Sequence, residues 1–227
     1  MNEALLNSNG IKLIELVEET TRVYIWKAIQ TNLDRTVFLI VLREEAAANE
    51  GERERFLMVA RQIAKLKSDS IAAIFDIVSS DTLHYVVMEF VEGATLDAVV
   101  RAEGALSFKR VMQVAMSIAA SLKLLWNSAR IIHCNLKGSV IRFDTRGVAK
   151  LVDFSRAAID SPEFRAAAPE NSEIFGSPPF VAPETVSGAE KFTIQSDMYS
   201  LGALLYYIAT AKMPFAGRSP EEMLAAH

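Results

Sequence analysis

Hydrophobic and polar residues alternate along several short runs in the first 91 residues of the chain. This alternation, or a run rich in β-branched and aromatic residues, predicts strands at 11–17, 23–28, 37–42, 71–78 and 84–91. One stretch differs, since residues 52–66 carry apolar side chains at the spacing of a helix face: Phe56, Val59, Ala60, Ile63 and Leu66. Residues 1–10 show neither pattern and are expected to be a polar lead-in. The first part of the chain is therefore expected to be β-rich with one main helix.

The rest of the chain mostly has the spacing of helices. Thr95 and Ser107 are expected to cap two of them, because a side-chain oxygen there accepts an otherwise unpaired backbone N–H. Residues 196–210 are apolar nearly all round, which predicts a buried helix, and a further helix is expected to begin at Ser219. The composition changes at Gly93, so we expect one lobe at residues 11–91 and a second at residues 92–227.

A polar loop between two apolar runs lies near the middle of the chain. Residues 131–132 are both isoleucine, residues 133–137 read His-Cys-Asn-Leu-Lys, and residues 140–143 are largely apolar again. A second apolar run at 149–152 leads into Asp153. This arrangement predicts a hairpin that presents polar side chains at the mouth of a cleft.

Taken in series, these segments resemble the signature motifs of protein kinases. The matching positions are His133, Asp153-Phe154, Ala182-Pro183-Glu184 and Asp197 to Gly202, and the layout is most similar to the eukaryotic-like (Hanks-type) serine/threonine kinases of bacteria. The resemblance covers residues 11–227 and implies an α+β, bilobal protein-kinase-like fold with a β-rich N-lobe and a mainly helical C-lobe. Kinases continue with two more helices beyond the one that begins here at Ser219 (helix G), so the C-lobe is expected to be truncated after it.

The residues that hold a kinase together are retained. By resemblance they are His133, Phe154, Ile63, Ile74, Asp197 and Glu184. The first four would join an apolar stack through both lobes, and Asp197 would hold the loop at His133 by hydrogen bonds. His133 is therefore interpreted as structural, with a general-base role as the alternative. Glu184 normally pairs with an arginine beyond helix G, so Arg156, Arg165 or solvent is its expected partner here.

The positions that carry the family's chemistry are changed. Asn135 stands where the catalytic Asp belongs, and an amide cannot accept the substrate's proton. Val140 replaces a metal ligand and offers no oxygen to Mg²⁺. Ile40 and Val59 replace a buried lysine–glutamate pair, and because both members are apolar we expect them to be in contact.

Two charged positions of the family's site remain, Lys137 and Asp153. Asp153 would be left alone where the family uses two metal ligands. Lys137 fits a solvated surface charge as well as it fits a phosphate ligand.

The resemblance also implies a degraded nucleotide pocket. Its lining positions would be Glu18, Thr20, Val23, Ile25, Phe38, Met88, Glu89, Val91 and Arg142. The first three replace glycines whose backbone covers phosphates in kinases, and an ordinary charged turn is expected instead. Phe38 would fill the roof and Arg142 the floor, with Glu92 or Asp97 as partner for the arginine, so we expect a pocket closed to ATP. The alternative is that Phe38 turns outward on a slipped strand and Arg142 points into water.

Composition excludes several other classes of protein. A net charge of −4 gives no basic surface for nucleic acid, and 51% hydrophobic residues are ample for a packed core. The single cysteine, Cys134, excludes an internal disulfide and a cysteine-built metal site, and it fits a reducing compartment. No signal peptide is visible, and the longest apolar run, residues 201–211, is too short to span a bilayer. We expect a cytoplasmic chain and leave open a membrane anchor outside this sequence.

These observations favour a pseudokinase, a kinase-like signalling module that binds, scaffolds or regulates without transferring phosphate. Its expected partners are proteins, such as an active kinase or a phosphopeptide-recognising protein, and no cofactor or metal ion is expected. Two alternatives stay open: an atypical ATP-dependent protein phosphotransferase using Lys137, Asp153 and Mg²⁺, and a sensor that binds ATP without transfer. A second lysine aimed at the cleft would favour the phosphotransferase. Lys27 is near enough, but its strand parity is open.

Overall fold

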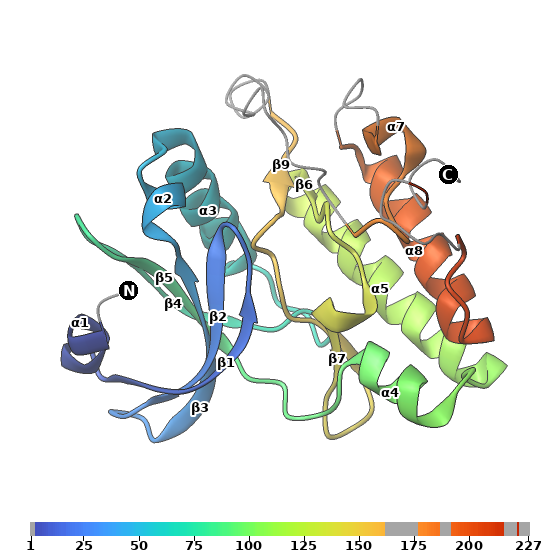
Figure 1. Ribbon diagram of the computed structural model, residues 1–227, viewed down its shortest axis with the longest axis horizontal. Coiled ribbons are helices and arrows are strands. Elements are labelled where there is room, and N and C mark those ends of the chain that lie inside the picture. The colour runs from blue at the N-terminus through green and yellow to red at the C-terminus, as the bar shows by residue number, and fades with distance from the viewer. Residues whose placement is uncertain (1–2, 162–176, 187–191, 216–221, 223–227) are drawn as a thin grey trace. The chain divides into compact units, whose positions relative to one another are not determined.

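The computed structural model describes residues 3–161, 177–186, 192–215 and 222 (Figure 1). The chain divides into two compact units. The first unit comprises Met1–Lys67 and Ala72–Phe90, and the second comprises Ser68–Ile71 and Val91–His227. Residues 162–176 lie outside the described residues, as does most of the helix expected from Ser219.

The first unit is built on one antiparallel five-stranded sheet in the order β1-β2-β3-β5-β4. Its strands are β1 (Ile11–Glu19), β2 (Val23–Gln30), β3 (Arg35–Leu42), β4 (Ile74–Ser79) and β5 (His84–Glu89). Its helices are α1 (Glu3–Ser8), α2 (Glu44–Ala47) and α3 (Glu50–Ile63), of which α3 packs against β4. The strands expected from alternation are therefore present, and the main helix lies where its apolar stripe predicted it.

One face of the sheet packs on a hydrophobic core that includes a residue of the expected polar lead-in. Val37, Leu39 and Val41 alternate along β3 toward this core, which also contains Leu6 of α1. The prediction of a polar lead-in at residues 1–10 is wrong for α1, because Leu6 is completely buried there. A six-residue helix has too few apolar positions to show a period, so this error follows from its length.

The predicted strand at 71–78 begins later than expected. β4 starts at Ile74, whereas Ile71 forms an isolated parallel bridge to Leu151 in the second unit. The hydroxyl of Ser121, in helix α5 (Phe108–Ala129), donates to the backbone carbonyl of Ser70 and so ties the same short segment to that helix. Apolar residues at 71–73 therefore serve two different units, a distinction that hydrophobicity alone does not make.

The second unit is mainly helical. Its elements are α4 (Leu96–Glu103), α5 (Phe108–Ala129), β6 (Ile131–Ile132), the 3₁₀ turn η1 (Gly138–Val140), β7 (Ile141–Phe143), β8 (Ala149–Leu151), β9 (Ala158–Ile159), α7 (Pro183–Val186) and α8 (Ile194–Thr210). The helices α5 and α8 pack against each other, as Figure 1 shows. Thr95 and Ser107 accept backbone N–H bonds as the predicted caps of α4 and α5. Thr193 and Ser196 form a reciprocal capping box at the start of α8.

A β-sheet unit and a mainly helical unit confirm the expected α+β fold. Among the described helices, none combines the length and the apolar character needed to cross a bilayer.

Candidate functional site

The turn between β1 and β2 uses its own backbone groups. The hydroxyl oxygen of Thr20 accepts the backbone N–H groups of Arg22 and Val23, at 3.2 and 3.0 Å. The Thr20 N–H in turn donates to the carbonyl of Val23 at 3.0 Å. Three amides that could otherwise face an anion are thus bonded inside the turn. With Thr20 and Val23 in place of glycines, the sequence predicts an ordinary charged turn. In the structure, the hydroxyl of Thr20 holds this turn together through its hydrogen bonds to two backbone N–H groups.

The strand register brings several of the predicted positions onto one face of the sheet. Directly opposed residues of antiparallel strands point to the same side. Two adjacent rows result: Glu18, Ile25, Ile40 and Val86 in one, and Lys27, Phe38, Met88 and Ile74 in the next. The parity of Lys27 is thereby fixed, since it shares the face of Phe38 and Ile40.

Phe38 lies inside the first unit. Its side chain is 2% exposed, and its ring centroid is 4.7 Å from that of Phe90. The ammonium of Lys27 lies 5.0 Å from the centroid of the same Phe90 ring. The alternative of an outward-turned Phe38 on a slipped strand is therefore wrong. Met88, beside Phe38 in the register, is also fully buried.

Ile40 and Val59 are buried where the family resemblance implies a lysine and a glutamate. Their exposed fractions are 4% and 3%. A charge at either place would need a partner, because removing one member of a buried ion pair costs about 3–5 kcal/mol. Ile63 of α3 is likewise buried. The direct contact between Ile40 and Val59 stays a prediction.

In the second unit, Asp197 of α8 fixes the backbone of the polar loop. Its two carboxylate oxygens accept the N–H groups of His133 at 2.7 Å and Cys134 at 2.9 Å. These are the hydrogen bonds that the resemblance implied. Cys134 has a φ of 63°, in the left-handed region that non-glycine residues rarely adopt. Burial raises the pKa of Asp197 to about 7, and the two N–H bonds act in the opposite direction.

His133 is an internal, neutral residue. Its Nδ1 accepts the backbone N–H of Asn135 at 3.4 Å, and its ring centroid is 5.5 Å from that of Phe154. Burial lowers the pKa of His133 to about 4, against the effect of the Asp153 carbonyl, so the ring is uncharged near neutral pH. This environment favours the structural interpretation of His133 over a general-base role.

The neighbouring loop holds the two positions that were compared with metal ligands, Val140 and Asp153. Asn135 and Val140 are both buried, and the backbone carbonyl of Val140 accepts the N–H of Val152 at 3.0 Å. Asp153 is buried as well, and its Oδ1 accepts the N–H of Ser155 at 2.8 Å. Within the described ranges, no three His, Cys, Asp or Glu side chains come together as a metal site would require.

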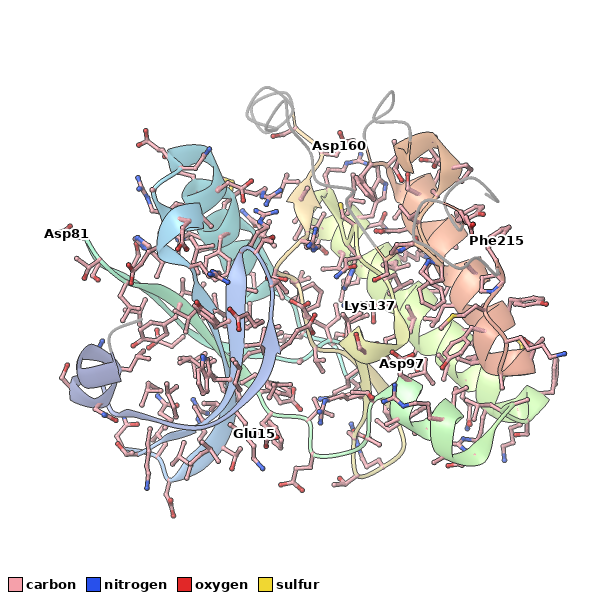
Figure 2. All side chains as sticks on the ribbon, viewed as in Figure 1. Glu15, Asp81, Asp97, Lys137, Asp160 and Phe215 are labelled. Atoms are coloured by element: carbon pink, nitrogen blue, oxygen red, sulfur yellow. The ribbon has the colours of Figure 1, made fainter. Side chains whose placement is uncertain are left out.

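The retained Lys137 has an acidic neighbour. Burial raises the pKa of Asp97 in α4, while the charges of Arg101 and Lys137 oppose that rise. The carboxylate also lies against Gly138, since a β-carbon there would be 1.9 Å from Asp97 Oδ1. Both Asp97 and Lys137 are labelled in Figure 2. The charge of Lys137 is thus balanced partly within the second unit.

Arg142 binds the segment that follows the first unit. Its Nη1 donates to the carbonyl oxygens of Val91 at 3.2 Å and Gly93 at 3.0 Å. The sequence suggested the carboxylates of Glu92 or Asp97 as partners, so the accepting groups are a correction. Backbone carbonyls are present at every residue, and no sequence signal marks these two. The alternative that Arg142 simply points into water is also wrong.

The same segment is joined to β7 by close backbone packing. The N–H of Phe143 donates to the carbonyl of Ala94 at 3.2 Å, and Gly93 faces the carbonyl of Phe143. Together with Arg142, these contacts hold residues 91–94 against β7 within the second unit.

Glu184 has a partner that was not anticipated. Its Oε1 accepts a hydrogen bond from the hydroxyl of Ser196 at 3.0 Å. An arginine or solvent was expected, and one candidate, Arg165, lies outside the described residues. The signal for Ser196 was available, because a serine in the first turn of a helix has a hydroxyl placed for capping interactions.

Comparison with known proteins gives a consistent result. A family model described as "Protein kinase domain" matches residues 11–227. A probable serine/threonine-protein kinase of Clostridium perfringens is 32% identical over 220 residues, covering 96% of this chain and 31% of the relative. PksC, a serine/threonine-protein kinase of Streptomyces coelicolor, is 30% identical, covering 95% and 40%. PknB, a serine/threonine-protein kinase of Mycobacterium tuberculosis, is 31% identical, covering 86% and 31%. The chain thus spans 31–40% of the length of these relatives.

The packing at Gly93 leads to a first prediction. Gly93→Ala would place a β-carbon 1.9 Å from the carbonyl oxygen of Phe143, so a main-chain shift is unavoidable. We expect the free energy of unfolding, measured in urea, to fall by about 2 kcal/mol or more. Gly202→Ala in α8 is the matched control, because nothing lies within 4 Å of its β-carbon and alanine favours a helix. Equal effects of the two substitutions would contradict the close approach.

The burial of His133 leads to a second prediction, which concerns the pH dependence of stability. Burial lowers the pKa of His133 from 6.5 to about 4. Between these two pH values the imidazole of the unfolded chain takes up a proton, whereas that of the folded chain does not. Stability from this residue is complete above the unfolded pKa and is lost as the pH falls. We expect the stability advantage of wild type over His133→Phe to shrink by about 2 kcal/mol between about pH 7 and pH 5. A pH-independent difference in urea unfolding would show that the ring titrates normally.

Proposed function

Because the chain belongs to the protein kinase family, we propose that it is a pseudokinase, a kinase-fold module that acts by binding proteins and transfers no phosphate. Its partner would be a protein of a signalling system, such as an active kinase or a phosphopeptide-recognising protein. No ATP or Mg²⁺ is needed for such a role.

The observation that carries the proposal is the closed β1–β2 turn. Kinases hold the phosphates of ATP by free backbone amides in this turn and by a lysine on the third strand. Here the amides of Thr20, Arg22 and Val23 are bonded within the turn. The lysine position holds Ile40, and Glu18 adds a negative charge in the same row of the sheet. At these positions the first unit therefore has bonded amides and an apolar side chain, where kinases present free amides and a lysine to the phosphates.

The second unit supports the same proposal. Asn135 provides no base, and Val140 provides no ligand for a metal ion. The guanidinium of Arg142 donates hydrogen bonds to the backbone carbonyls of Val91 and Gly93. Groups that act as a unit in catalysis are strongly non-additive, so the loss of one of them already removes most of the rate that the whole set provides.

One observation favours a second candidate, an atypical protein phosphotransferase. Lys27 shares the sheet face of Phe38 and Ile40, where a substitute lysine would have to lie. Lys137 and Asp153 also remain, and the relatives are named as serine/threonine kinases. Against this candidate, the Lys27 ammonium lies over the ring of Phe90, and Ser155 and Asp97 already interact with the two retained charges.

Phosphate transfer is the direct test. Purified protein incubated with radiolabelled ATP, Mg²⁺ or Mn²⁺ and a general protein substrate is expected to transfer no label above background. Asn135→Asp alone should rescue nothing, because the lysine, the helix acid and the second metal ligand are still missing. Transfer by the wild type that disappears in Asp153→Ala would establish the phosphotransferase instead.

Nucleotide binding separates the pseudokinase from an ATP sensor. In titration calorimetry we expect no heat of ATP binding by the wild type, with or without Mg²⁺. Phe38→Ala removes a buried ring and should allow at most weak binding of adenine compounds. Phe108→Ala is the matched control, since that phenylalanine is 81% exposed. Micromolar affinity of the wild type for Mg-ATP would move the function to nucleotide sensing.

A further inference from the structure

A network of charged side chains joins the β1–β2 turn to α3. Arg22, in the turn, forms an ion pair with Glu52 in the first turn of α3. Arg55 pairs with the same carboxylate at 3.1 Å from within the helix. The three side chains are only 12%, 14% and 12% exposed, so solvent screens this network less than it screens a surface pair.

A second arginine holds the other side of the turn. Arg43, between β3 and α2, donates to the Glu19 carboxylate at 3.0 Å and to the Thr20 carbonyl at 3.1 Å. Its backbone N–H donates to the carbonyl of Arg22 at 2.8 Å, and its guanidinium lies 4.8 Å from the ring centroid of Tyr24. In Figure 1 the tip of the β1–β2 hairpin accordingly lies beside α2 and α3. The turn is thus attached to the body of the unit on both sides.

The position of this network at the start of α3 is important, because the contact expected between the middle of α3 and the central strand β3 involves apolar residues. Val59 of α3 and Ile40 of β3 are both apolar and buried. Apolar contact attracts without direction, whereas a partly buried ion pair fixes a position and is costly to leave half-made. One ionic attachment of α3 therefore lies in its first turn, where Glu52 pairs with Arg22 of the β1–β2 hairpin.

We propose that Arg22 couples the β1–β2 turn to α3, so that the two segments open together and a partner that displaces the turn also releases the helix. If Arg22 leaves, the carboxylate of Glu52 loses its contact with the turn, although Arg55 of the same helix still pairs with it. The turn loses an anchor in the same event. By linkage, a change at either end must act on the other to the same extent. This coupling concerns the first unit alone and does not depend on whether the protein transfers phosphate.

Hydrogen exchange measured by mass spectrometry on the purified protein tests the coupling. Arg22→Met keeps the length of the side chain and removes its charge. We expect exchange to rise by about tenfold both at residues 20–24 of the turn and in the first turns of α3, since about 1.4 kcal/mol of lost pairing changes an opening equilibrium by that factor. Glu52→Gln, made from the helix side, should raise exchange in the turn by a similar factor.

Two arginine variants are matched controls. Arg55→Met removes a charge from the same carboxylate but leaves the connection to the turn, so exchange in the turn should stay at the wild-type rate. Arg35→Met affects the β2–β3 hairpin, where Arg35 donates to Gln30 and lies over Phe75, and should leave α3 unchanged. The charge-reversed double variant, Arg22→Glu with Glu52→Arg, should recover part of the protection that either single reversal loses.

Three results would overturn the proposal. Faster exchange confined to the turn in Arg22→Met, with α3 unchanged, would show that the ion pair couples nothing. Uniform loss of protection through every strand of the unit would show a general contribution to stability. If Arg22→Met does not fold, Glu52→Gln decides alone, and an unchanged turn in that variant contradicts the coupling.

Discussion

The loop at the centre of the second unit depends on one carboxylate. Asp197 accepts two consecutive backbone N–H groups and so holds Cys134 in a left-handed conformation that its side chain disfavours. His133 is kept buried beside Phe154 by the same arrangement, and the backbone that follows enters η1 and β7. This frame needs a buried acceptor with two oxygens, and an amide in its place would turn a donor toward one of the two N–H groups. Every group that holds this frame belongs to the chain itself, so the frame requires no nucleotide.

The parts of the fold that were predictable are those that repeat. Alternation along β1 to β5 and the apolar stripe of α3 follow directly from burial on one side of an element. Motif order gave Asp197 its role, because a short polar signature at fixed spacing is as informative as a period. By contrast, α1 was missed because one buried leucine in a six-residue helix has no period. Ile71 was assigned to the wrong unit because hydrophobicity says that a residue is buried but not against what.

At the candidate site the sequence shows which residue types are present, but not which contacts they make. That Asn135 has an amide and Val140 an apolar side chain can be read directly, since both are properties of the residue. The contacts are properties of geometry: the hydroxyl of Thr20 closing its own turn, and Arg142 finding two carbonyls. Each uses backbone groups that every residue has, so the sequence contains no sign of which ones are chosen. The ion pair of Arg22 with Glu52 has the same character, because thirty positions separate its members.

The retained charges do not by themselves argue for catalysis. A buried charge needs a partner whether or not it takes part in catalysis, because leaving it unpaired costs several kcal/mol. Among the family's charged positions, Asp197 is bonded by two N–H groups, Asp153 by the N–H of Ser155, and Glu184 by the hydroxyl of Ser196. Ile40 and Val59 are both apolar and buried, so neither position has a charge that needs a partner. The chain thus keeps these carboxylates where its own atoms satisfy them, and the same bonds would hold if no phosphate ever reached the site. The N–H of Ser155 thus gives Asp153 a partner within its own chain, so its presence does not by itself require a chemical role.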